Sequence, residues 1–341
     1  MGDSQEILQI VTLNVKGLLL TEIHNASGLM CTLCGTTSWK SGPEAVVCVS
    51  CGAIYAIDDG VVQMHTADDT DDATRFYAAF DGTPFVNASF ESNPLIYITT
   101  RAYRRFLEKI FPGPSGRLID FGCGDGRFSL WAAEKGFFSV VAVDSNLPSL
   151  KRLAKEALKR HLEGLVIVCA DLKKPPFQPD HFDAVLCFEV LYYLVQSLGR
   201  HGAIKAPAGL LREGGRMVIS EFSRLGRAII DLDAMDLVNV RSLLSSSTRW
   251  EKVADTRTRV FQWSLAELKS DLREVELNII DQAGISPAAG IFNYAWNFTS
   301  YPLRPQLDAD LRTVLETICD ETSDAVDAAR NVVLALEKGH K

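Results

Sequence analysis

The chain has 341 residues, of which 47% are hydrophobic, and it carries a formal net charge of −8. The length suggests about two domains, and the hydrophobic share is ordinary for a folded protein, which argues against a disordered one. The acidic balance disfavours a nucleic-acid partner, because phosphate binding favours clustered Lys and Arg.

Membrane and secretion signals are not evident in the sequence. No apolar run approaches the ~20 residues that span a bilayer, so we expect no membrane partner. The start, MGDSQEILQI, lacks the basic segment of a signal peptide, and Glu6 stands where a myristoylation motif requires Ser or Thr. We therefore predict a cytoplasmic location, where the eight cysteines serve as thiols or metal ligands rather than disulfides.

Two C-x-x-C-G segments, CTLCG and CVSCG, follow a short strand-like stretch near the N-terminus. Two residues between thiolates let one tight turn bring both sulfurs to one metal, and the glycine supplies the backbone freedom that this turn needs. Four sulfurs suit a tetrahedral structural zinc site with no open position for catalysis. Paired disulfides, buried free thiols and an iron site are the less favoured interpretations. The predicted ligands are Cys31, Cys34, Cys48 and Cys51.

A regular alternation of strands and helices follows a polar linker at 65–75. The pattern predicts helices at 74–80 and 94–110, strands at 117–121, 139–143, 165–169, 183–188 and 216–222, and intervening helices at 127–135, 147–161, 190–196 and 203–213. This alternation predicts a parallel sheet with helices on both faces.

The alternation stops after Phe222. Residues 224–258 predict an inserted, partly helical lid, and SLAE at 264–267 is a capping box that opens a helix. Strands near 277–281 and 291–298 would complete the sheet. A last helix is predicted over about 307–337.

The glycine-rich stretch LIDFGCGDGRF, at 118–128, indicates the ligand. A dinucleotide fingerprint requires glycine at the position of Arg127, and a P-loop would end in GK[ST], so phosphate binding is disfavoured. S-adenosylmethionine (SAM) fits better, because glycines let its methionine half lie against the backbone and Asp120 could offset its positive charge. Asp144 and Asp171 end the next two predicted strands and could accept the ribose hydroxyls and the adenine amino group.

Residues 117–222 resemble the class I SAM-dependent methyltransferases in the order and spacing of five motifs. The glycines with Asp120 match the first motif, Asp144 the second and Asp171 the third, while FDAVLCFEVLYYL and LREGGRMVIS match the fourth and fifth. The resemblance implies an α/β, Rossmann-like, seven-stranded sheet whose last strand is antiparallel. The cofactor-binding residues that we expect are Asp120, Gly122, Cys123, Gly124, Asp125, Gly126, Asp144, Ser145, Asp171, Leu172, Phe188 and Tyr77.

The second cysteine pair continues as CGAIYAIDDGVVQM, which is similar to the zinc-ribbon family of the small activator subunit of tRNA and protein methyltransferases. Tyr55, Asp59, Gly60 and Val61 fit that family's pattern. The resemblance implies protein docking or substrate handling by the ribbon.

Few residues are candidates for the chemistry itself. The fourth motif faces the transferred methyl group, and its CFEV lacks the [ND/S]-P-P-[YF] of enzymes that methylate adenine N6 or cytosine N4. Glu189 is a candidate base or substrate anchor, although it could equally be a first-turn helix charge. Tyr192 could line the pocket, and Tyr77 could cover the methionine end.

We therefore predict an N-terminal strand and zinc ribbon over 1–66, a linker with SAM-covering helices over 67–115, and a class I methyltransferase domain over 116–341. The predicted activity is methyl transfer from SAM to an O, N or C atom of a small molecule. The alternatives are an RNA methyltransferase with a substrate-binding ribbon, and a non-catalytic SAM-binding scaffold.

Overall fold

The computed structural model describes residues 27–64, 94–113, 116–162, 164–253, 256–285, 326 and 329–339. The strands are β1 (Trp39–Ser41), β2 (Ala45–Cys48), β3 (Ile54–Asp58), β4 (Val61–Gln63), β5 (Arg117–Phe121), β6 (Ser139–Asp144), β7 (Leu165–Cys169), β8 (Phe182–Phe188), β9 (Leu211–Phe222), β10 (Thr248–Val253), β11 (Thr256–Phe261), β12 (Leu277–Ile285) and β13 (Asn331–Lys338). The helices are α4 (Pro94–Ile110), α5 (Arg127–Lys135), α6 (Leu147–Lys159), α7 (Leu191–Ala208), α8 (Arg224–Asp233), α9 (Leu237–Ser246) and α10 (Leu265–Glu274).

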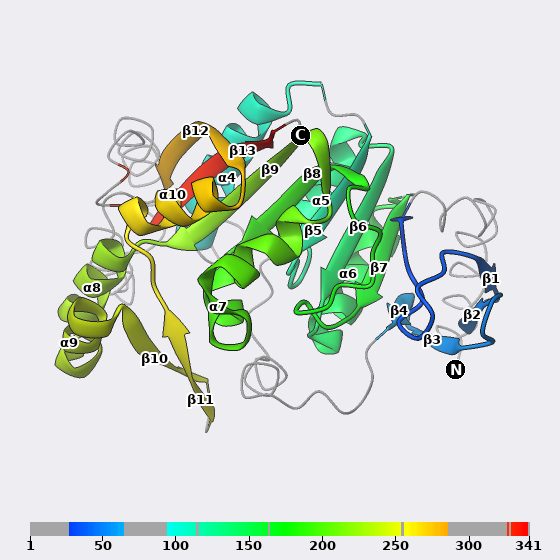
Figure 1. Ribbon diagram of the computed structural model, residues 1–341, viewed down its shortest axis with the longest axis horizontal. Coiled ribbons are helices and arrows are strands. Elements are labelled where there is room, and N and C mark those ends of the chain that lie inside the picture. The colour runs from blue at the N-terminus through cyan, green and yellow to red at the C-terminus, as the bar shows by residue number, and fades with distance from the viewer. Residues whose placement is uncertain are drawn as a thin grey trace, which may run out of the picture.

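Eleven of these strands form one mixed sheet in the order β1-β2-β3-β4-β7-β6-β5-β8-β9-β13-β12 (Figure 1). Strands β7, β6, β5, β8 and β9 run parallel, and β13 pairs antiparallel with both β9 and β12. The five strands predicted for the parallel part are therefore confirmed. The carboxyl ends of these parallel strands meet at one edge, where open α/β sheets bind ligands.

The sheet has eleven strands in the described chain instead of the seven expected, because the N-terminal module joins it. Strand β4 pairs parallel with β7, with Val61 opposite Ile167 and Gln63 opposite Cys169. Val61 is fully buried in this junction, so its apolar side chain favours the pairing. The sheet is consequently continuous from the cysteine-rich module into the α/β core.

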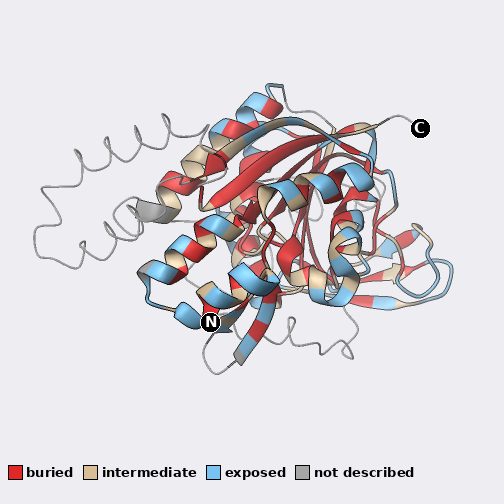
Figure 2. Cartoon of the chain, turned by 60° about the vertical axis from the view of Figure 1, so that its left-hand side comes forward, coloured by how far each residue is buried: buried red, intermediate tan, exposed pale blue. Residues whose placement is uncertain are grey.

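Helices cover both faces of the sheet, and Figure 2 shows the central strands buried between them. Helices α4 and α5 pack with the even-numbered side chains of β5 and β8, such as Leu118 and Leu186. Helices α7 and α10 pack with the odd-numbered side chains, such as Ile119 and Cys187, in the same core as the N-terminal module. The alternation of strand side chains thus places one large core on the face covered by α7 and α10, and two smaller apolar clusters on the other face, one of them between β6, β7 and α6.

The structure corrects three predicted helices. The helices predicted at 190–196 and 203–213 are one element, α7, interrupted at Gly199 (φ 70°, ψ 170°), and residues 211–213 belong to β9. The helix predicted over 307–337 is wrong at 331–337, where NVVLALE forms strand β13 between two neighbours. A continuous apolar run suits a strand buried on both faces as well as a helix, so periodicity alone could not distinguish them.

Residues 224–261 form a separate insert of two helices and the β10–β11 hairpin, at the opposite end of the molecule from β1–β3 (Figure 1). The capping box that precedes α10 is confirmed, because Ser264 and Glu267 each bond the other's backbone. The predicted linker at 65–75, the helix at 74–80 with Tyr77, and the strand at 291–298 lie outside the described residues. None of the described helices is long and apolar enough to cross a membrane.

Candidate functional site

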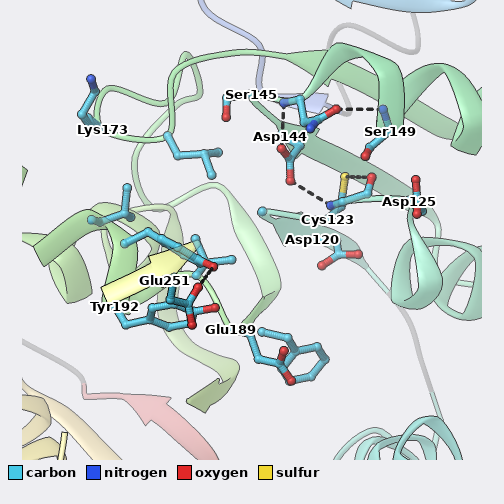
Figure 3. A pocket seen from close by; sticks show the side chains of 18 of the residues that line it. Asp120, Cys123, Asp125, Asp144, Ser145, Ser149, Lys173, Glu189, Tyr192 and Glu251 are labelled. Atoms are coloured by element: carbon cyan, nitrogen blue, oxygen red, sulfur yellow. Dashed lines mark hydrogen bonds between the residues drawn. The ribbon is translucent and has the colours of Figure 1, made fainter. Parts of the chain in front are cut away.

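A cavity of about 640 Å³ lies at the carboxyl ends of β5, β6, β7 and β8 and extends to the insert (Figure 3). Most of the residues predicted to bind cofactor line it. They are Asp120, Gly122, Cys123, Gly124, Asp125, Asp144, Ser145, Asp171, Leu172 and Phe188, and the two catalytic candidates, Glu189 and Tyr192, join them. Gly126 is described but is not among the lining residues.

The glycine loop needs its glycines for two different reasons. All three have positive φ, and a Cβ at Gly122 would lie 2.2 Å from Val190, while one at Gly126 would lie 2.2 Å from Leu153. A Cβ at Gly124 would meet nothing within 4 Å. Gly122 and Gly126 therefore allow helices α7 and α6 to approach the loop, whereas Gly124 leaves open space on the cavity side.

Asp144 shapes the loop as well as the cavity wall. Its Oδ2 accepts a hydrogen bond from the Gly124 N–H and its Oδ1 accepts one from the Asn146 N–H, both at 2.8 Å. Burial raises the pKa of Asp144, although these backbone donors favour the ionised form. Each carboxylate oxygen keeps a further lone pair for a ligand hydroxyl.

Asp120 is buried at the end of β5, beneath the glycine loop. Its Oδ2 accepts a hydrogen bond of 2.6 Å from the Ser129 hydroxyl. Burial raises the pKa of Asp120 to about 6, and the nearby Asp144 adds to the effect. This carboxyl is therefore partly protonated in mildly acidic solution, and a cation in the cavity would favour its ionised form.

The loop after β7 connects the cavity to the cysteine-rich module. Asp171 Oδ1 accepts a hydrogen bond from the Lys173 N–H at 2.9 Å. A few residues on, the Met30 N–H donates to the Pro176 carbonyl and the Gln178 N–H donates to the Gly28 carbonyl, both at 2.8 Å. The module thus holds the far side of the loop that carries Asp171.

Glu189 is fixed by donors from distant parts of the chain. Its Oε1 accepts hydrogen bonds from the Tyr103 hydroxyl (3.3 Å) and from Asn331 Nδ2 (3.0 Å), and its backbone has φ 61°. The Arg127 guanidinium lies near it, over the Phe128 ring at 4.4 Å, and also lines the cavity. The sequence prediction used Arg127 only to exclude a dinucleotide site and missed this position.

The other end of the cavity is bounded by α7 and the insert. The rings of Tyr192 and Tyr193 lie 4.0 Å apart, and the Tyr193 hydroxyl donates to Glu251 Oε2 at 2.7 Å. Arg249 donates to both oxygens of Asp231 at 3.0 Å and to Glu251 Oε1 at 2.8 Å. These ion pairs connect α8 to the β10–β11 hairpin. No local sequence pattern predicts which of these charges pair with one another.

The four predicted metal ligands come together. The sulfurs of Cys31, Cys34, Cys48 and Cys51 lie within 4.8 Å of one another, and Cys31 Sγ is 3.2 Å from the Tyr55 hydroxyl. A set of four thiolates at this spacing fits a tetrahedral zinc ion. Cys123, Cys169 and Cys187 lie apart from this cluster, in or beside the core strands.

Comparison with known families identifies part of the chain. A family model described as a methyltransferase domain matches residues 119–219, which include β5 to β9 and the glycine loop. Residues 119–219 are therefore similar to a methyltransferase domain, and the resemblance to class I methyltransferases is supported at that level.

The individual proteins that the chain resembles share less than a third of its residues over the matched part. An uncharacterized chloroplastic methyltransferase of Arabidopsis thaliana is 25% identical over 60% of this chain and 64% of its own length. A ubiquinone biosynthesis O-methyltransferase of Xanthomonas campestris pv. campestris is 29% identical over 50% of this chain and 66% of its own length. A structure of geranyl diphosphate methyltransferase with SAM gives a TM-score of 0.46, with 16% identity over 70% of this chain and 85% of that one. The chain spans 48% to 66% of the length of the curated relatives that it matches.

Proposed function

We propose that this chain transfers a methyl group from SAM to a small-molecule acceptor. The observation that carries the proposal is one continuous cavity, which runs from the glycine loop and the acids at the strand ends to the aromatic side chains of α7 and the charged side chains of the insert. One end has the groups that a sulfonium nucleoside requires, and the other end has room for an acceptor. The match of residues 119–219 to a methyltransferase domain supports this assignment.

At the cofactor end, each group has a distinct role in the proposal. The methionine half lies against Gly122, Cys123 and Gly124, and Asp144 accepts the ribose hydroxyls. Asp171 and Leu172 hold the adenine, and Ser145, Asp125 and Phe188 complete the wall. Tyr77 remains a predicted cover residue.

At the acceptor end, side chains of the protein align the acceptor's nucleophile with the methyl group of SAM. SAM supplies an activated methyl group with a neutral leaving group, so placing the nucleophile in line provides most of the rate increase. Tyr192 and Tyr193 offer an aromatic wall for a small organic molecule. Glu189, held at Oε1 by two donors, can use Oε2 to anchor or deprotonate the acceptor. The Xanthomonas relative's name supports a small-molecule acceptor.

The cysteine cluster holds zinc in this proposal, with a structural role. Zinc would fix the module that contacts the Asp171 loop through Met30 and Gly28. Docking of a protein partner on the ribbon is the second role that its family resemblance suggests.

Binding and labelling experiments test the proposal. Calorimetric titration with S-adenosylhomocysteine (SAH) should give one site per chain. Incubation of the protein with methyl-labelled SAM and a cell extract, split into metabolite and RNA fractions, should label the metabolite fraction alone. Absence of SAH binding would refute the methyltransferase assignment, and labelled RNA would favour the RNA alternative.

A further inference from the structure

Three arginines lie beside the end of the cavity that the insert bounds. The guanidinium carbon of Arg227, in α8, lies 5.3 Å from the centre of the Phe222 ring, and that of Arg330, just before β13, lies 5.4 Å from the same ring. Arg227 and Arg249 line the cavity. Burial lowers the pKa of Arg227, and the positive charges of Arg249 and Arg330 add to this effect. Like charges this close in a half-buried place need anions to compensate them.

Acidic side chains of the insert compensate these arginines only in part. Arg249 donates to both oxygens of Asp231 and to Glu251 Oε1, and the Tyr193 hydroxyl donates to Glu251 Oε2. Arg227 reaches Asp231 Oδ1 only at 3.6 Å and Glu251 Oε1 only at 3.9 Å, and both distances are too long for a hydrogen bond. The charged groups that shift the pKa of Arg227 are these two acids and two further arginines. Three arginines therefore share two acids.

Arginine donors without a partner remain at this end of the cavity. The Nε atoms of Arg227 and Arg330 are buried and have no hydrogen-bond partner in the described part of the chain, and the Arg227 side chain is only 18% exposed. Asp236, another acid that lines the cavity, already accepts hydrogen bonds from the Asn239 N–H and side-chain amide as the cap of α9. A buried donor without a partner is costly, so an anion bound here would be stabilised by these arginines.

An aromatic surface adjoins the Arg227 guanidinium. Tyr192 of α7 lines the cavity, and its ring packs edge-on against Phe222 at 5.7 Å, the same ring over which Arg227 lies. Figure 3 shows Tyr192 and Glu251 close together, at the end of the cavity away from Asp144. This end therefore combines an apolar aromatic wall with a guanidinium that has hydrogen bonds to give.

We propose that the acceptor is an organic acid with a flat apolar body, and that Arg227 binds its carboxylate or phosphate. A guanidinium donates two parallel hydrogen bonds to either group, and a neutral acceptor receives weaker ones. The inference rests on the proposed function and narrows it, because the methyl group would go to an acidic small molecule. The carboxylate of SAM is the other anion expected in the cavity, but the methionine half is proposed to lie at the glycine loop, at the opposite end.

Binding of small aromatic probes to the full chain tests this inference. Benzoate and phenyl phosphate carry the two anionic groups, and benzamide is a neutral probe of nearly the same shape as benzoate. NMR titration, with and without saturating SAH, should give at least one of the acids a dissociation constant about tenfold or more below that of benzamide. Arg227→Gln should remove this preference, and Arg227→Lys should retain part of it. Arg241→Gln, at an exposed arginine of α9, is the matched control and should bind like the wild type.

The outcomes separate this inference from the proposed function. Equal binding of both acids and benzamide by the wild type, or an acid preference that survives in Arg227→Gln, would overturn the inference. Loss of SAH affinity in Arg227→Gln with unchanged binding of the acids would assign Arg227 to the cofactor and overturn it as well. Circular dichroism checks the fold of each variant, and the wild-type comparison stands without any variant. An acid preference that depends on Arg227, in a protein that binds no SAH, would refute the proposed function alone.

Discussion

Loss of the zinc that we propose for the cysteine-rich module should weaken cofactor binding in the cavity, which no residue of this module lines. The double substitution Cys48→Ser, Cys51→Ser removes two of the four clustered sulfurs. The module's strands have only three to five residues each, so its own core is small and metal should supply much of its folding energy. We therefore expect the module to unfold in this variant while the α/β core stays folded.

The magnitude follows from the contacts between the module and the Asp171 loop. Hydrogen bonds from Met30 to Pro176 and from Gln178 to Gly28 fix this loop, and Leu29, fully buried, bridges to Phe177. Fixing the backbone of one freed residue costs about 1–2 kcal/mol. If two loop residues must be re-ordered on binding, SAH affinity falls by about 2–4 kcal/mol, or about 30- to 1000-fold.

Calorimetric SAH titration, with elemental analysis of the same samples, measures this effect. Val49→Ser is the matched control, because it changes an exposed side chain of the same turn and leaves all four sulfurs. A metal-free double variant whose module is unfolded by hydrogen exchange, yet which binds SAH as tightly as the control, would refute the reasoning. Freshly purified wild type without zinc would refute the ribbon's metal assignment itself.

Three further predictions concern the cavity. Asp144→Ala removes the acceptor of two backbone N–H groups, so the free energy of unfolding should fall by about 1–3 kcal/mol and SAH affinity at least tenfold; unchanged denaturation and calorimetry would contradict this. Gly126→Ala should destabilise the protein by about 2–4 kcal/mol in chemical denaturation, because it combines positive φ with a clash at Leu153. The matched Gly124→Ala, with open space, should cost only about 1 kcal/mol, and equal effects would refute the packing role. The pKa of Asp120 is raised from 3.8 to about 6 in the folded protein, so the unfolded chain releases this proton at a lower pH. The stabilisation that the protonated Asp120 carboxyl gives the folded state is therefore lost as pH rises toward 6. Cationic SAM favours the ionised carboxylate, so SAM affinity should rise through pH 6 in calorimetry, and Asp120→Asn should abolish that rise.

Much of the α/β core could be predicted from local sequence. The helices at 94–110 and 127–135 and the strand at 117–121 have the predicted bounds, because apolar runs, Gly and Pro mark their ends within a few residues. The strand-end acids, such as Asp120 and Asp144, reach one cavity because parallel strands end at the same edge. The alternation of strands and helices along the chain predicts this shared edge without any knowledge of side-chain contacts.

Contacts between distant segments could not be predicted in this way. Asn331, which donates to Glu189 across 142 positions, lies in a segment predicted to be helical. The pairing of Arg249 with Asp231 depends on how two helices and a hairpin stack, and many acids were available to that arginine. Residues 331–338 form a strand rather than a helix because the edge of β9 was open to pairing. An apolar run that pairs there is buried on both of its faces.

The sequence by itself determined the order of the motifs, the glycine loop with its acids, and the set of four cysteines, because each depends on residue types at short spacing. Only the tertiary structure decided that β4 extends the sheet at β7 and that the insert bounds the end of the cavity away from the glycine loop. The physical reason is that an edge strand has unpaired backbone N–H and C=O groups, which can bond to any extended segment. Which segment pairs with the edge therefore depends on which apolar segment the folded chain brings to it.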